Sequence, residues 1–261
     1  MTYRSIALTR SDAIAHLAFD RPDKLNSFTR DMLAEIAAAL DEVAADRTAR
    51  VLVLTGKGRA FSAGHDLNDP GALGTPNDVR STIDRLYAPM IRKLVALEIP
   101  TVAAINGIAA GAGCSVALAC DLAVAASSAS LLQAFTRIGL APDAGSSFFL
   151  PRRIGQARAM GMALLAEAIP APKAAEWGLI WQAVEDAAFP AAIDALAKRL
   201  AAAPTRALAL TKRALAASAG NSLDQQLALE AELQALAAGT ADFKEGAAAF
   251  LEKRPARFTG H

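Results

Sequence analysis

The chain has 261 residues, of which 27 are basic and 26 acidic, so its formal net charge is +1 at pH 7. This balance, with no basic stripe, argues against nucleic acid as the main partner. The length lies near the upper limit for one hydrophobic core, which predicts one main domain. Apolar residues make up 53% of the chain and aromatic residues only 5%, which favours closely packed helices over an α/β core.

The cysteines and the N-terminus indicate a cytoplasmic protein. Cys114 and Cys120 lie six residues apart in an apolar segment, and they form neither a C-x-x-C motif nor a disulfide framework, so we expect reduced core thiols. Residues 1–12 carry charges where a signal peptide needs an apolar core.

The first third of the chain alternates strand and helix patterns. Residues 6–8 and 14–19 predict a hairpin, a helix follows from about Thr29, and 51–54 is a buried strand. The strand, helix, strand order implies a parallel pair. A glycine-rich loop over 55–67 leaves the carboxyl end of that strand, where ligands of α/β sheets usually bind. We expect residues 68–78 to form a mobile lid and 79–97 a helix.

The centre of the chain, residues 101–147, predicts a ligand cleft. An apolar strand over 101–106 leads into three glycines, a helix over 114–119 and a second strand over 122–126. Backbone with so little side-chain bulk can place bare N–H groups against a ligand. Asp143 stands at the next turn, before a helix start. Such helix N-termini would stabilise a negative charge beside this acid.

The remainder of the chain predicts helices and one short strand over 180–184. The helical patterns cover residues 156–166, 173–177, 191–202, 205–217, 223–238 and 241–254. We expect residues 1–200 to form the core and residues 201–261 a helical appendage.

Several other motifs can be set aside. Residues 99–120 carry no charge, but internal Pro100, Asn106 and glycines argue against a membrane helix. Gly111-Ala-Gly113 lacks the third glycine of a dinucleotide fingerprint, and no P-loop occurs. Ser62 lacks the leading glycine of a nucleophile elbow. His65 has no second metal ligand at suitable spacing, so we expect no metal site.

Two stretches together, residues 58–67 (GRAFSAGHDL) and 106–114 (NGIAAGAGC), resemble the enoyl-CoA hydratase/isomerase (crotonase) family. The turn over 21–26 and the segment over 139–143 fit it too, so the resemblance runs over nearly the whole chain. It implies a spiral of ββα turns, a C-terminal region that forms trimers or dimers of trimers, and acyl-CoA thioesters as substrates. No further cofactor, metal, nucleic acid or membrane is implied.

In this family two backbone N–H groups hold the thioester oxygen. By resemblance these are the N–H of Ala63 and that of Ala112 or its neighbour Gly111. The loop from Ala63 through Gly64, His65, Asp66 and Leu67, together with Asn26, Gly111 and Ala112, would also bind the substrate and its coenzyme A moiety. The donors would stabilise the enolate formed when a proton next to the thioester is removed.

The sequence departs from the hydratase pattern at both catalytic glutamates, where it has Ser115 and Phe135. Asp143 instead occupies a position where several isomerases of the family carry an acid. A single carboxylate can take a proton from one carbon and return it to another, which is isomerisation. The alternative role for Asp143 is a helix N-cap.

Within the family, the resemblance is strongest to isomerases that convert ring-1,2-epoxyphenylacetyl-CoA to oxepin-CoA, and the same site should shift enoyl-CoA double bonds. The alternatives are hydration, attack by Asp143 on an aryl-CoA as in dehalogenases, with His65 activating water, and a non-catalytic acyl-CoA-binding or RNA-binding relative.

Overall fold

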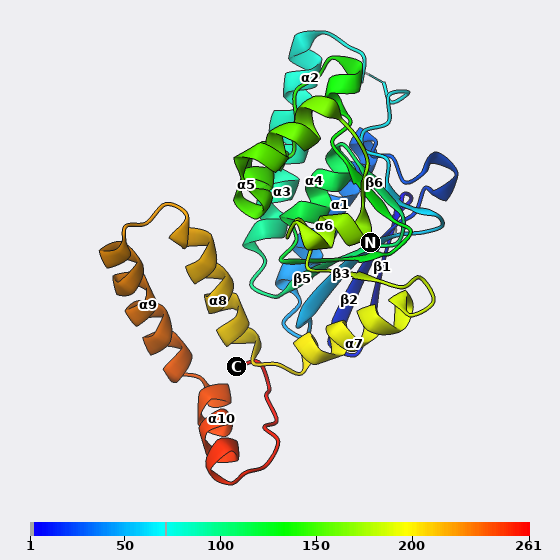
Figure 1. Cartoon of the computed structure of the whole chain (residues 1–261). Coiled ribbons are helices and arrows are strands. Elements are labelled where there is room, and N and C mark those ends of the chain that lie inside the picture. The colour runs from blue at the N-terminus through cyan, green and yellow to red at the C-terminus, as the bar shows by residue number, and fades with distance from the viewer. Residues whose placement is uncertain (1–2, 71) are drawn as a thin grey trace.

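The computed structural model describes residues 3–70 and 72–261. Two sheets form the core (Figure 1). The larger has six strands, in the order β1 (Ile6–Ser11), β2 (Ile14–Phe19), β3 (Val51–Gly56), β5 (Thr101–Ile105), β7 (Leu122–Ala126) and β10 (Gln182–Val184). The smaller has four, in the order β4 (Ala60–Ser62), β6 (Ile108–Ala110), β8 (Ser130–Leu132) and β9 (Ile169–Pro170).

The chain repeats one unit three times: a strand of the large sheet, a strand of the small sheet, then a helix. The helical parts are α2 (Pro76–Thr82) with its continuation, α4 (Ala112–Ala119) and α5 (Ser146–Leu165). This order confirms the predicted spiral of ββα turns. Strands β3, β5 and β7 pair in parallel and are mostly buried, as strands covered on both faces are.

The start and the buried face of helix α1 (Arg30–Ala45) follow from its local sequence. The hydroxyl of Thr29 accepts a hydrogen bond from the N–H of Met32 at 3.2 Å and so caps the helix start. Its apolar residues recur at helical spacing and are buried against the sheet. The helix leads into β3, which pairs with β2 in parallel, as predicted.

A continuous helical stretch begins inside the expected lid, at Pro76, before the predicted helix start at residue 79. Helix α2 passes into a π-helical turn, η2 (Ile83–Tyr87), and then into α3 (Ala88–Ala96). The lid itself, residues 68–78, includes position 71, which lies outside the described residues, and its expected mobility stays a prediction. The remaining short helices are η1 (Pro22–Lys24), η3 (Phe135–Ile138) and α6 (Ala171–Glu176).

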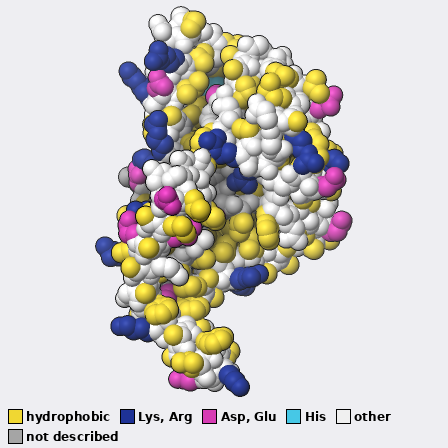
Figure 2. Space-filling view, turned by 60° about the vertical axis from the view of Figure 1, so that its left-hand side comes forward, with side chains coloured by type: hydrophobic (Ala, Val, Ile, Leu, Met, Phe, Trp, Pro, Cys, Tyr) yellow, Lys and Arg dark blue, Asp and Glu magenta, His cyan; other side chains and the backbone are white. Residues whose placement is uncertain are grey.

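Helices α8 (Thr205–Ser218), α9 (Leu223–Ala238) and α10 (Ala241–Leu251) extend away from the sheets as an arm, after α7 (Phe189–Ala201) (Figure 1). Lys212 fixes α8 to the core through an ion pair with Asp121 at 2.7 Å and hydrogen bonds to two backbone carbonyls. Figure 2 shows apolar side chains gathered on this arm. The large exposed ones are Leu215, Leu223, Leu227, Leu236, Phe243, Phe250 and Leu251.

Residues 99–120, which a hydropathy scan would suggest as a membrane helix, form β5, β6 and α4. Among the described residues, no helix is both long and apolar enough to cross a bilayer. Both cysteines are free and buried, as expected, and burial raises the pKa of each thiol to about 12.

Candidate active site

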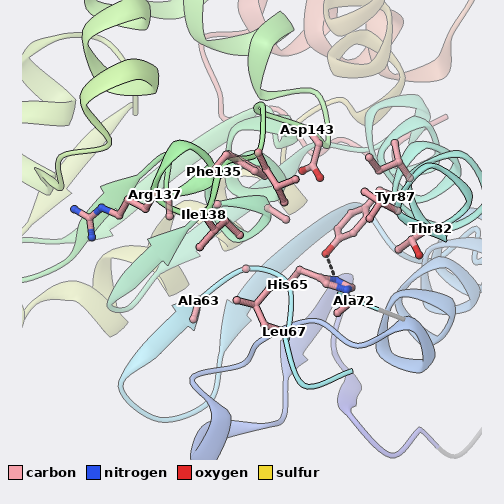
Figure 3. Close-up of a pocket in the computed structure, with 17 residues that line it drawn as sticks. Ala63, His65, Leu67, Ala72, Thr82, Tyr87, Phe135, Arg137, Ile138 and Asp143 are labelled. Carbon is pink, nitrogen blue, oxygen red and sulfur yellow. Dashed lines mark hydrogen bonds between the residues drawn. The ribbon is translucent and has the colours of Figure 1, made fainter. Parts of the chain in front are cut away.

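The candidate site is a cavity of about 250 Å³ at one edge of the small sheet (Figure 3). Strands β4, β6 and β8 pair in parallel, so their carboxyl ends lie at the same edge. The residues that come after these three strands line the cavity, together with residues from α2, η2 and the turn at Asp143.

Gly64 brings the first two of these loops into direct backbone contact. Its φ of +92° is strained for other residues. A Cβ atom there would lie 2.8 Å from the carbonyl oxygen of Ala110 and 3.4 Å from the amide nitrogen of Ala112. Only glycine therefore allows this approach without a shift of the backbone.

Backbone pairing decides which N–H groups remain for a ligand. The N–H of Ala63 donates to the carbonyl of Leu25 at 2.9 Å, and that of Gly111 donates to Leu132 at 2.8 Å. Both are committed within the fold, so the prediction that Ala63, or Gly111 in place of Ala112, supplies an oxyanion donor is corrected.

Two other amides are better placed. The N–H groups of His65 and Ala112 have no hydrogen-bond partner among the described residues, and both residues line the cavity. Ala112 is the first residue of α4, where helix geometry leaves the N–H groups unpaired and the helix dipole favours negative charge. The prediction for Ala112 is retained, and His65 replaces Ala63.

Asn26 and Asp66, predicted to bind substrate, belong to the scaffold. Asn26 is fully buried, and its side-chain amide bonds to the carbonyls of Lys57 and Ala60 and to the N–H of Arg21. The Asp66 carboxylate pairs with Arg21 at 2.9 Å. Neither side chain lines the cavity. They shape the loop after β4 instead.

The other predicted members of that loop do reach the cavity. Ala63, Gly64, His65 and Leu67 line it, as do Gly111 and Ala112. Leu67 is 41% exposed, so this part of the lining is open to solvent.

Asp143 is the one carboxylate among the described lining residues. Its Oδ1 is buried and has no hydrogen-bond partner within residues 3–70 and 72–261. Burial raises the pKa of this carboxyl from its ordinary value of 3.8 to about 6, because desolvation disfavours the charged form. Its side chain does not cap α5, whose N-cap is Gly145. The capping alternative is therefore wrong.

Ser115, where a hydratase has a glutamate, has a positioning role here. Its hydroxyl donates to the backbone carbonyl of Asp143 at 3.1 Å, and Ser146 donates to the same carbonyl from its N–H and its hydroxyl. The backbone of Asp143 is thus held while its carboxylate stays free. Phe135 covers another part of the cavity wall.

Tyr87 is a site residue that was not predicted from the sequence. This residue is 2% exposed, lines the cavity, and its hydroxyl lies 3.0 Å from Nδ1 of His65. The sequence signal that could have identified Tyr87 is its place on the apolar face of an amphipathic helix, because a buried phenol needs a polar partner. Among the described residues, no cluster of three or more His, Cys, Asp or Glu could hold a metal ion.

Comparison with known proteins agrees with this geometry. Residues 9–261 match the family model described as "Enoyl-CoA hydratase/isomerase". The chain belongs to the enoyl-CoA hydratase/isomerase family. An enoyl-CoA hydratase structure from Bacillus anthracis superposes with a TM-score of 0.94 at 31% identity, covering 99% of this chain and 100% of that chain.

Relatives with different activities have similar identities. A "Probable enoyl-CoA hydratase" of Rhodobacter capsulatus is 47% identical over 100% of both chains. The "1,2-epoxyphenylacetyl-CoA isomerase" of Escherichia coli is 46% identical over 94% of each chain. A "4-chlorobenzoyl coenzyme A dehalogenase-2" of Arthrobacter is 36% identical over 95% of this chain and 91% of its own. The chain is therefore an enzyme of a family that acts on acyl-CoA substrates.

Gly64→Ala should lower the free energy of unfolding by about 1–3 kcal/mol, because the new Cβ meets the backbone and φ is positive. Urea unfolding measures the change. The matched control is Gly161→Ala within α5, where a Cβ meets nothing within 4 Å, and which should gain up to about 1 kcal/mol. Equal stabilities for the two variants would contradict the close approach.

Asp143→Asn should stabilise the protein at pH 8. The raised pKa means that the folded state favours the neutral carboxyl, so the contribution of Asp143 to stability is present below pH 3.8 and is lost as pH rises through 6. Asparagine removes a penalty of at most about 3 kcal/mol. Thermal unfolding should show a higher melting temperature at pH 8 and little change near pH 4. The surface variant Glu167→Gln should show neither effect.

Proposed function

We propose that the protein is an acyl-CoA isomerase that converts ring-1,2-epoxyphenylacetyl-CoA to oxepin-CoA and also shifts 3-enoyl to 2-enoyl thioesters. The observation that carries this proposal is the single carboxylate in the cavity, Asp143, with one oxygen buried and unpartnered. A site with one proton carrier suits a reaction in which a proton leaves one carbon and returns to another.

The oxyanion hole in this proposal consists of the N–H groups of His65 and Ala112. Removal of a proton from the carbon next to a thioester places negative charge on the carbonyl oxygen. Donors fixed by the fold stabilise that charge more than the neutral ground state, and each is worth about 10²–10³ in rate. The N-terminus of α4 adds its dipole.

Asp143 then moves the proton. Its pKa of about 6 leaves it deprotonated at neutral pH, so it can accept the proton from the α-carbon. Once protonated, it is acidic enough to return the proton to the γ-carbon, two bonds further along the chain. The starting and final states of the enzyme are the same, and no water is added.

The ring epoxide fits the same proton shift. Opening of the bond between ring carbons 1 and 2 gives the seven-membered oxepin, and transfer of a proton from the side-chain methylene to the ring conjugates the ring with the thioester. All atoms of the substrate remain in the product. Similarity to the Escherichia coli isomerase over 94% of each chain supports this acyl group.

Hydration is less well supported, although one relative is named a probable hydratase. Hydratases of the family use two carboxylates, and the corresponding Ser115 and Phe135 offer none. Dehalogenation would need a histidine to activate water near Asp143. Nδ1 of His65 is instead paired with the Tyr87 hydroxyl, which disfavours that role.

The remaining parts of the proposal concern partners. The coenzyme A ester enters past Leu67 and is itself the substrate, with no further cofactor. We also propose that helices α8–α10 are the oligomerisation region, residues 201–261, of a homotrimer or dimer of trimers, because seven large apolar side chains lie exposed there. Free buried cysteines are in keeping with a cytoplasmic location.

Purified protein should turn over the ring epoxide and 3-enoyl-CoA, and should hydrate 2-enoyl-CoA poorly. The kcat/KM for isomerisation should rise with pH through about 6 and then level off, because Asp143 must be deprotonated to accept a proton. Asp143→Asn should lower kcat by at least about 10²-fold while coenzyme A esters still bind, and Glu167→Gln serves as the control. Unchanged turnover in Asp143→Asn would remove the catalytic assignment.

Ala112→Pro tests the oxyanion donor. Proline is tolerated at the first position of a helix, where it deletes an N–H that makes no helical bond, so α4 should persist. Turnover should fall about 10²–10³-fold, and circular dichroism should show an intact fold. A loss of only a few-fold in a folded variant would place the donor elsewhere.

A further inference from the structure

Tyr87 reaches the cavity from an irregular turn of helix. It is the last residue of the π-helical segment η2, between α2 and α3. Such π-turns are rare, and they occur often at functional sites. Figure 3 shows the Tyr87 ring between Asp143 on one side and His65 on the other. Its hydroxyl meets the imidazole of His65 at 3.0 Å.

The two groups are both neutral at physiological pH. Burial lowers the pKa of His65, so the imidazole carries one N–H. Burial, and next the charge of Asp143, raise the pKa of the Tyr87 phenol well above its ordinary value, so its O–H is retained. With the imidazole proton on Nδ1, His65 donates to the phenol oxygen, and the O–H of Tyr87 is free to donate into the cavity.

The proposed isomerisation does not require the hydroxyl of Tyr87. The thioester oxygen is held by backbone N–H groups, and Asp143 carries the proton. The other side chains that line the cavity are mainly apolar, among them Val79, Ile83, Phe135, Ile138 and Leu140. Arg137 also lines it, but its guanidinium points away from Tyr87 and Asp143 (Figure 3). Thr82 also lines the cavity, but its hydroxyl donates to the carbonyl of Asp78. A hydrocarbon chain needs no donor in this place, whereas an acyl group that bears an oxygen does.

We propose that the Tyr87 hydroxyl, oriented by His65, is a specificity residue that donates a hydrogen bond to an oxygen atom on the acyl ring of the substrate. This inference rests on the proposed function and extends it to the choice of acyl group. A site that hydrogen-bonds a substrate oxygen discriminates against analogues that lack it, because its own buried polar group is then left unpaired.

The kinetic test is Tyr87→Phe, which removes one oxygen atom. The kcat/KM for the ring epoxide should fall roughly tenfold or more, while that for 3-hexenoyl-CoA should fall much less. Tyr3→Phe is the matched control, since Tyr3 is the other tyrosine of the chain and bonds to Glu42, outside the cavity. It should change neither value. Equal losses on both substrates in Tyr87→Phe would overturn the inference.

A binding test separates this inference from the proposed reaction. Phenylacetyl-CoA and 2-hydroxyphenylacetyl-CoA differ by one ring oxygen. Calorimetry should show that Tyr87→Phe weakens binding of the hydroxylated ester several-fold and leaves that of phenylacetyl-CoA within about twofold. Wild-type protein that binds both esters with equal affinity would refute the inference even if isomerisation is observed. Absence of isomerisation with the expected binding difference would refute the proposed reaction alone.

The role of His65 can be tested in the same assays. His65→Asn keeps a donor near the position of Nδ1, whereas His65→Leu removes it, and both keep the backbone N–H. The ratio of kcat/KM for the epoxide to that for 3-hexenoyl-CoA should fall in His65→Leu and recover in His65→Asn. The same ratio in both variants would show that His65 does not orient Tyr87.

Discussion

The site depends on the close parallel approach of two three-residue strands, β4 and β6, and on the loops that leave their carboxyl ends. The pairing of the strands places Gly64 against the backbone of Ala110 and Ala112, a distance that no side chain would allow. The N–H groups of Ala63 and Gly111 donate to the carbonyls of Leu25, in the turn after η1, and of Leu132, at the end of β8. Amides further along each loop, at His65 and Ala112, are thereby left facing the cavity. These two amides are the proposed oxyanion donors, because nearly every buried N–H in a folded protein has a partner and theirs would be the substrate.

Asp143 is positioned through its backbone and not through its carboxylate. Three hydrogen bonds, from Ser115 and Ser146, end on its backbone carbonyl, and none of those residues bonds to the carboxylate. The fold therefore fixes the location of the acid without stabilising its charge, which is why desolvation raises its pKa. A glutamate at 115 would remove one of these bonds and add a second acid. The serine thus leaves Asp143 as the one carboxylate among the described lining residues and supports its backbone.

Most of the fold could be predicted from the sequence, and part of the site could not. Helix α9 and strands β2 and β7 match their predicted ranges, because their hydrophobic patterns extend over five or more residues and so indicate the type of element. Strands β4, β6 and β8 have three residues each, too few for a period. Without β8, the partner of Gly111 at Leu132 could not be identified, and the partner of Ala63 is Leu25, in a turn far away along the chain. The first donor was therefore predicted at Ala63, two residues before His65. The structural role of Asn26 was also not apparent, because two of its three side-chain partners, the carbonyls of Lys57 and Ala60, lie more than 30 residues away along the chain. Asp143 was found because it stands alone in a turn of small residues.

In the proposed reaction, the charges around Tyr87 keep its recognition of a ring oxygen independent of proton transfer. Asp143 changes its protonation near pH 6, within the working range of an enzyme. Its negative charge, when present, opposes ionisation of Tyr87, since two like charges in a desolvated cavity repel each other strongly. The phenol therefore keeps its proton in both states of the acid. A ring oxygen would meet a donor throughout the catalytic cycle, and only the carbon-bound hydrogen would change place. A carboxylate or a charged imidazole in the position of Tyr87 would interact with the charge of Asp143. The affinity for the ring oxygen would then change with the protonation of Asp143, which also controls turnover.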